Sequence, residues 1–122
     1  MANTLRIGAE GEKAAMEWLR AHGHVVVERN WRNPPHEIDI ITLSSDGHYH
    51  FVEVKTRHEG SLTTPVEALS RKKIANLIKA ANFYVELHSI TSEVWLDFMG
   101  ITQRDDDTYS VEYIPDVAGV HW

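Results

Sequence analysis

The 122-residue sequence contains no cysteine, and this absence excludes several kinds of site. Disulfide bonds, thiolate zinc centres and cysteine nucleophiles all require a thiol. The chain also lacks any apolar run near the roughly 20 residues that cross a bilayer, and it begins without a signal-peptide pattern. We therefore expect a cytoplasmic protein with no membrane partner. A single domain over residues 1–122 is expected as well, because this length supports one hydrophobic core.

Positive charge is scarce, above all near the end of the chain. The formal net charge is −6; residues 1–84 hold 11 Lys and Arg against 10 Asp and Glu, whereas residues 85–122 hold 1 against 8. A negative chain argues against a nucleic-acid partner, because phosphate contacts supply most non-specific affinity. The first two thirds of the chain are nearly neutral, so a nucleic-acid partner is not excluded. A bound divalent cation would also change the local sign of the charge.

The hydrophobic pattern predicts a helix, three strands, a second helix and two strands. The first helix is expected over residues 4–22, where Ala15, Met16 and Leu19 recur at helical spacing, and Gly23 is well suited to end it. Strands are expected over residues 24–29, 36–43, 48–56, 94–102 and 109–114. The β-branched run 25–27 is typical of a buried strand.

The second helix is predicted to begin at the capping-box pattern of residues 64–67, Thr-Pro-Val-Glu. Its apolar stripe comprises Ile74, Leu77, Ile78, Ala81 and Val85. The order of elements predicts an α/β fold with an αβββαβ core, in which helices flank a mixed central sheet. The second helix is then a right-handed crossover between parallel strands.

A hairpin between the second and third strands fixes which side chains become neighbours. The segment Ser45-Asp46-Gly47 reads as a three-residue loop, so Ser44 faces His48. Counting back from the loop pairs Ile41 with Phe51, Asp39 with Glu53 and Glu37 with Lys55, and it places Ile38 and Ile40 together on the opposite face.

Acidic residues occupy the middle of both hairpin strands, where the alternation favours apolar ones. Aspartate is a poor strand former, and the carboxylates of Asp39 and Glu53 would repel each other across the strands. Either Lys55, on the same face, compensates, or a divalent cation such as Mg²⁺ does, since Mg²⁺ binds one or two carboxylates and keeps several waters. A solvated hairpin face with ordinary ion pairs, Glu37 to Lys55 included, explains the same residues without a site.

Glu12 is a third candidate. It lies on the stripe of the first helix that holds the apolar residues, so it should point toward the sheet. There it either joins the acidic pair or is simply an acid favoured by the helix dipole near the helix start.

These residues resemble a known nuclease pattern. The placement of Asp39 before Glu53-Val54-Lys55, after a helix that carries Glu12, is similar to the PD-(D/E)XK superfamily, which includes restriction endonucleases and archaeal Holliday-junction resolvases. More closely, segments 8–12, 28–32, 37–39 and 51–57 resemble the YraN family of small bacterial proteins, predicted endonucleases of that superfamily.

The resemblance covers the chain from about residue 8 to residue 98. This chain departs from the pattern at two positions: His36 stands where the family usually has glycine, and Ile38 where the superfamily has proline. The resemblance implies a restriction-endonuclease-like fold.

The resemblance also implies a mechanism for hydrolysis of nucleic-acid phosphodiester bonds. Asp39, Glu53 and the carbonyl of Val54 would hold Mg²⁺ (or Mn²⁺), which polarises the scissile phosphate and acidifies a bound water. Lys55 would orient that water or stabilise the developing charge, and Glu12 would complete a second metal position or hold Lys55 in place. By analogy with the resolvases the substrate is DNA, branched or damaged, and a homodimer is plausible.

Candidate nucleic-acid contacts lie around this set. They are Arg29, Arg32, Thr56, Arg57 and Lys72. Arg71 and Lys73 are more typical of a solvated helix start, and histidines 22, 24, 48 and 50 of the surface. The competing hypothesis is a non-catalytic nucleic-acid or protein-interaction module that keeps the nuclease fold, for which the acidic last third would offer a protein-binding face.

Overall fold

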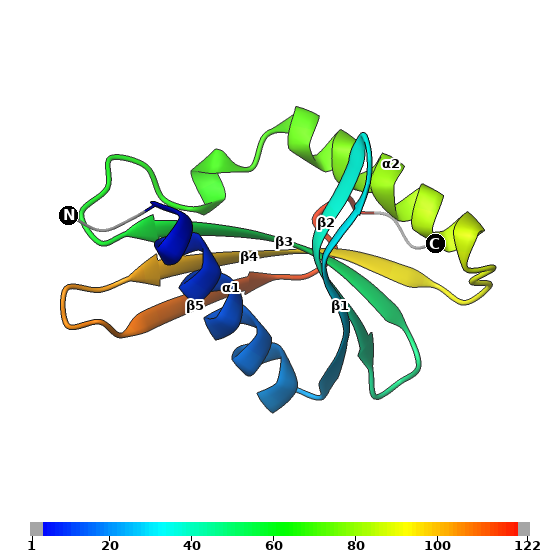
Figure 1. Cartoon of the computed structure of the whole chain (residues 1–122), viewed down its shortest axis with the longest axis horizontal. Coiled ribbons are helices and arrows are strands. Elements are labelled where there is room, and N and C mark those ends of the chain that lie inside the picture. Colours follow the sequence, from blue (N-terminus) through cyan, green and yellow to red (C-terminus); the bar gives the residue numbers. More distant parts are fainter. Residues whose placement is uncertain (1–3, 120–122) are drawn as a thin grey trace.

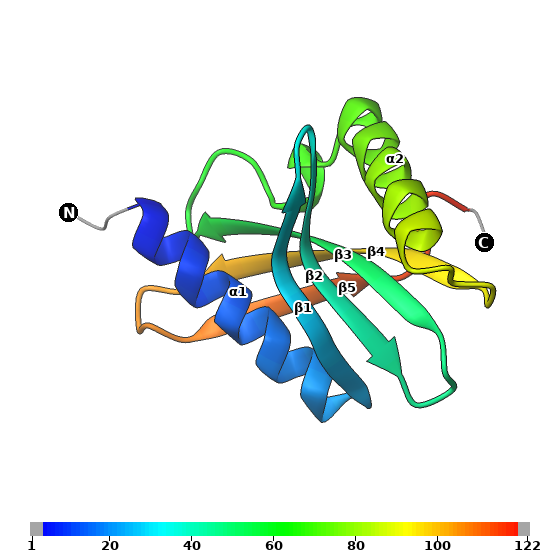
Figure 2. The ribbon, with the colours of Figure 1, turned by 45° about the vertical axis from the view of Figure 1, so that its right-hand side comes forward.

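The structure is a computed structural model that describes residues 4–119, with side chains from residue 9 onward. It consists of a five-stranded sheet in the order β1-β2-β3-β4-β5, in which β3 and β4 are parallel and the other neighbours antiparallel. Helix α1 packs on one face of the sheet and helix α2 on the other (Figures 1 and 2). The elements are α1 (Thr4–Ala21), β1 (His24–Asn33), β2 (His36–Ser44), β3 (Tyr49–His58), η1 (Val66–Ala68), α2 (Arg71–Leu87), β4 (Val94–Gln103) and β5 (Tyr109–Ile114). The predicted αβββαβ core is confirmed, with β5 as an additional edge strand.

Helix α1 follows its sequence pattern. Its stripe residues Ala15, Met16 and Leu19 are buried against β2, β3 and β4, and the chain leaves the helix at Gly23 with a φ of 89°. Near its beginning the helix backbone passes directly over β3, because Gly11 has no side chain. A Cβ atom at this position would lie 2.1 Å from Thr56 Oγ1.

Helix α2 begins later than predicted. The capping pattern is formed, since the Glu67 amide donates to Thr64 Oγ1, but it starts only the short 3-10 helix η1. The chain then becomes extended, and Ser70 caps α2 through the Lys73 amide. The buried face of α2 holds Leu77, Ala80, Ala81 and Tyr84. Within residues 4–119, no helix is long and apolar enough to cross a membrane.

The β2–β3 hairpin has the predicted register between the loop and Ile40, but the predicted pairs of Asp39 with Glu53 and of Glu37 with Lys55 are not part of the ladder, and Glu37 instead faces Arg32 of β1. Ile41 faces Phe51, and the Ser44 amide donates to the His48 carbonyl at the loop. The ladder ends at the pair of Ile40 and Val52, where β2 begins to diverge from β3. Positions 37 and 39 therefore lie just beyond the paired part of the hairpin.

The alternation predicted for the start of β2 is wrong. Ile40 packs in the cluster under α1, whereas Ile38 packs with Ile41 in the cluster under α2. The neighbouring strand β1 is irregular at the same level, where Asn30 has a φ of 51°. Beyond this point the β1–β2 hairpin turns toward α2, so that its tip lies beside the beginning of that helix in both views (Figures 1 and 2).

The expectation that residues 25–27 form a buried strand is also wrong. β1 is an edge strand, and Val25 and Val27 are 66% and 41% exposed. β-branched residues favour the extended backbone of any strand, so a run of them does not show whether the strand lies at the centre or at the edge of the sheet.

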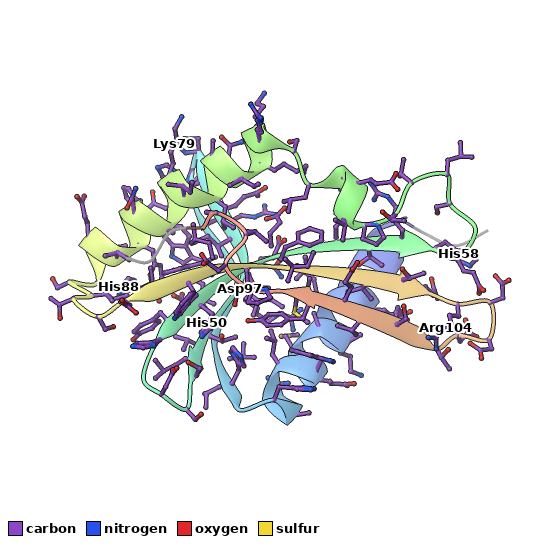
Figure 3. The ribbon with its side chains drawn as sticks, turned by 180° about the vertical axis from the view of Figure 1, so that it is seen from behind. His50, His58, Lys79, His88, Asp97 and Arg104 are labelled. Carbon is purple, nitrogen blue, oxygen red and sulfur yellow. The ribbon has the colours of Figure 1, made fainter. Side chains whose placement is uncertain are left out.

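Two of the histidines expected at the surface belong to a polar network on the α1 side of the sheet. His50 Nδ1 lies 2.6 Å from a carboxylate oxygen of the fully buried Asp97, and the two side chains lie together in Figure 3. The Tyr113 hydroxyl and the Asp116 amide also donate to Asp97. The His24 ring packs edge-on against His50, and burial lowers the pKa of His24.

Candidate active site

The fold brings Asp39 and Glu53 together at the point where β2 leaves β3. Asp39 accepts a hydrogen bond of 2.8 Å from the Val54 amide, which has no β2 backbone partner beyond the end of the ladder. The Asp39 and Glu53 carboxyls also hydrogen-bond each other. In a strand, the N–H and C=O of one residue point toward the same neighbour, so the Val54 carbonyl lies on the Asp39 side of β3.

The electrostatics of this pair are unfavourable for two carboxylates. Burial is the largest influence on Glu53, and the charge of Asp39 adds to it, so the pKa of Glu53 rises to about 7. Burial also raises the pKa of Asp39, against the effect of its hydrogen bond from Val54. Neutral pH lies close to the pKa of Glu53, so the pair exists both with and without a proton on Glu53, and a bound cation would favour the ionised form.

Glu12 reaches the same region from α1. Burial and the charge of Asp39 raise its pKa, whereas Arg29, Arg32 and a hydrogen bond with Asn30 act in the opposite direction. Asn30, which has a positive φ within β1, therefore holds the Glu12 carboxylate from the strand. The predicted orientation of Glu12 toward the sheet agrees with this arrangement.

Two lysines provide positive charge near the acidic pair. Lys55 has a lowered pKa, first because of burial and then because of Lys73 and Arg57, while Glu53 and Asp39 act to raise it. Lys73, from the first turn of α2, acts on both carboxyls and lowers their pKa values. Lys73 is exposed, as expected of a solvated helix start, but the connection of its charge with the two carboxyls was not predicted from the sequence. Its position four residues before the buried Leu77 was the available signal, since residues at this spacing share a helix face.

A cleft of about 330 Å³ opens between α2 and the β1–β2 hairpin, with Glu53 in its wall. We call it the α2 cleft. Its polar lining residues are His36, Glu37, Glu53, Lys73, Asn76 and Lys79. His36, which departs from the family pattern, lies in the same cleft wall as Glu53, because the bend of the hairpin brings it there.

The candidate nucleic-acid contacts are distributed unevenly around the site. Arg29 and Arg32 are exposed and act on Glu12, and Arg32 lies 3.8 Å from the Glu37 carboxylate. Thr56 is held beneath α1, where its side chain faces Gly11. Lys72 is exposed and is absent from the lining of the α2 cleft, and Arg57 donates to the Thr56 carbonyl, so neither contacts the acidic pair directly.

The donor set suits a hard divalent cation. Among the described residues, no three His, Asp or Glu side chains converge closely enough to enclose a metal ion on their own. Mg²⁺ does not require such a cage, because it binds through one or two carboxylates and retains water. Two half-buried carboxyls with raised pKa values, beside a backbone carbonyl on the Asp39 side of β3, match this requirement.

Comparison with known proteins finds one family over most of the chain. A family model described as "Uncharacterised protein family UPF0102" matches residues 11–106, a segment that contains every candidate site residue. A UPF0102 protein of Beutenbergia cavernae is 40% identical over 113 residues, covering 92% of this chain and 95% of the relative. UPF0102 proteins of Parabacteroides distasonis (34% identical; 95% of this chain, 94% of the relative) and Nitratidesulfovibrio vulgaris (37%; 89% and 81%) are similar over comparable lengths.

Proposed function

From the premise that the chain belongs to the uncharacterised protein family UPF0102, we propose that it is a metal-dependent endonuclease that hydrolyses phosphodiester bonds in DNA. The observation that carries this proposal is the half-buried pair of Asp39 and Glu53, two neighbouring carboxyls with raised pKa values beside Lys55 and Lys73. Membership of the family says nothing of the reaction. Fold likeness alone does not define function, so the argument depends on the chemistry of these side chains.

Asp39, Glu53 and the Val54 carbonyl would hold Mg²⁺ or Mn²⁺, which would polarise the scissile phosphate and acidify a water molecule. Lys55 extends from the same strand as Glu53, so its ammonium group can orient the attacking water and stabilise charge that develops on the phosphate. The lowered pKa of Lys55 reflects a partly desolvated ammonium group, whose interaction with an anion is stronger than in bulk water.

Lys73 and Glu12 have supporting roles in this proposal. Lys73 balances the two carboxylates from the α2 side and is placed to neutralise an incoming phosphate. Glu12 approaches from the α1 side, where its interaction with Asp39 allows it to restrain that carboxyl or to assist a second cation. The site thus draws one charged group from each helix and the rest from β2 and β3.

A cleavage assay tests the proposed activity. Linear duplex, single-stranded and branched DNA should be incubated with Mg²⁺ or Mn²⁺ and the wild-type protein, Asp39→Asn or Lys55→Gln. We expect cleavage of at least one substrate by the wild type and a loss of about 100-fold or more in both variants. Glu17→Gln is the matched control, because Glu17 is exposed on α1. Equal inactivity of all four proteins on every substrate would favour the non-catalytic module.

Metal binding can be tested without turnover. Calorimetric titration with Mn²⁺ should give a binding isotherm for the wild type and for Glu17→Gln, and a weaker one for Asp39→Asn. Mutation of a residue that only orients a metal ligand commonly lowers metal affinity by about 10- to 100-fold, so the loss of a direct ligand should lower it at least as much. An unchanged isotherm for Asp39→Asn would place the metal elsewhere or exclude the site.

A further inference from the structure

We propose that the α2 cleft takes one unpaired nucleotide next to the scissile phosphate, so that the substrate is DNA with a single-stranded stretch. This inference rests on the proposed endonuclease function and names its substrate class. Three features support it: the position and size of the cleft, an aromatic ring in its wall that other rings support from behind, and the two lysines among its lining residues.

The cleft adjoins the acidic pair directly. Glu53 belongs both to the pair and to the cleft wall, so a group that fills the cleft must lie next to a phosphate bound at Asp39 and Glu53. The volume of about 330 Å³ is at the small end of the range of roughly 300–1,000 Å³ for small-molecule sites. Such a volume suits a single nucleotide and leaves no room for a stacked base pair.

One wall of the cleft contains a ring on which a base can stack. The His36 ring lines the cleft and packs against Phe83, with ring centroids 5.0 Å apart. Phe83 in turn packs against Trp31 at 6.1 Å, and Trp31 stands edge-on to Tyr84 at 5.3 Å. The row is anchored in the core beneath α2, so the imidazole at its end is held in place. Base stacking on such a ring is tolerant of sequence, because every base has a π-face.

The polar groups of the cleft divide between base and phosphate. The Asn76 side-chain amide offers both a donor and an acceptor, which suits the edge of a base that has lost its pairing partner. Lys73 and Lys79 supply positive charge at the cleft wall. Figure 3 shows Lys79 projecting from α2 at the end of the molecule opposite His58 and Arg104.

The overall charge supports the same substrate class. A chain with a net charge of −6 is poorly suited to neutralise phosphates along a length of duplex. Stacking and a local cluster of lysines give affinity for one splayed nucleotide without a broad basic surface. The acidic residues that repel a rigid duplex do not prevent a flexible single strand from entering the cleft.

Binding measurements with abasic DNA test this inference. Fluorescence anisotropy in Ca²⁺ should compare three kinds of DNA: a single-stranded oligonucleotide, the same sequence as blunt duplex, and a duplex with a single-stranded gap. In a set of these gapped duplexes, an abasic site is moved one position at a time through the gap. We expect the single-stranded gap to bind at least tenfold more tightly than the duplex. One abasic position should weaken binding by about 5- to 100-fold, and its neighbours much less.

Variants show whether the base lies in the α2 cleft. His36→Ala should weaken binding of intact DNA and abolish the dependence on the abasic position, and Asn76→Ala should weaken binding of intact DNA as well. His58→Ala is the matched control, because His58 is exposed at the far end of β3. RNA of the same design serves as a further arm, and tighter binding of RNA than of DNA would overturn the choice of DNA.

The outcomes separate the two proposals. An abasic effect that depends on His36, together with inactivity on every substrate, would support the nucleotide cleft and overturn the endonuclease. Cleavage of blunt duplex with no preference for single strands, and a flat abasic scan, would support the endonuclease and overturn the cleft.

Discussion

Removal of the acid at position 53 should stabilise the metal-free protein at alkaline pH. The pKa of Glu53 is about 7 in the folded protein and 4.5 when the group is unperturbed. Between these values the unfolded chain releases a proton that the folded protein retains. The stability that Glu53 contributes is therefore fully present below about pH 4.5 and is lost as the pH rises through about 7.

The pKa difference sets the magnitude of this effect. Each unit of difference between two pKa values corresponds to about 1.4 kcal/mol, so the step from 4.5 to about 7 corresponds to about 3 kcal/mol at pH 8. Glu53→Gln cannot ionise, and its amide can still donate to Asp39. We expect the variant to exceed the wild type by about 1–3 kcal/mol at pH 8 and to match it near pH 4.5.

Urea unfolding in EDTA at pH 4.5, 6 and 8 measures the difference. Glu37→Gln is the control, because Glu37 is largely exposed and faces Arg32, and its effect should stay within about 0.5 kcal/mol at each pH. Addition of Mg²⁺ should then raise the stability of the wild type more than that of Glu53→Gln. If Glu53→Gln is less stable than the wild type at pH 8 in EDTA, the carboxyl pair is not strained and the reasoning fails.

Three further results are expected. Gly11→Ala should lower the free energy of unfolding by about 1–3 kcal/mol in a urea titration, and Thr56→Ala should restore most of that loss because it removes the clashing atoms. Asp97→Ala should cost at least about 2 kcal/mol in the same assay, since it leaves buried donors without their acceptor; a smaller loss would show that water replaces the carboxylate. Lys73→Gln should reduce the cleavage rate about tenfold or more, whereas Arg71→Gln should have little effect, because Arg71 is not among the residues that line the α2 cleft. Equal cleavage rates for the two variants would exclude Lys73 from the site.

The sequence was sufficient to predict the geometry that depends on local rules. Gly47 and the loop length determine the hairpin register as far as the pair of Ile40 and Val52, so residues 39 and 53 follow at the same end of the ladder. The helical spacing of Glu12 with Ala15, Met16 and Leu19 likewise predicts its orientation, and this prediction does not depend on the topology of the sheet. Each of these predictions depends on the spacing between residues in one element or in two consecutive elements.

The predictions that failed depend on contacts between distant segments. The exposure of Val25 follows from the position of β1 at the sheet edge, which the residues of β1 do not encode. Lys73 reaches the acidic pair because α2 begins at Ser70, after Pro65 has packed against Gly100 on β4. The burial of His50 depends on Asp97, 47 residues later in the chain.

A comparison of Asp97 with Asp39, two acidic positions in the sheet, separates structure from function. Asp97 is fully buried and accepts bonds from His50, Tyr113 and the Asp116 amide, so the protein itself supplies its partners. Asp39 receives one backbone N–H and a proton shared with Glu53, a second acid that burial also disfavours. An apolar pair at the same positions would be more stable, so a purely structural role does not account for the two acids. Sites where local stability is given up are characteristic of function, and Asp39 with Glu53 is therefore the place in the sheet where we expect a functional role.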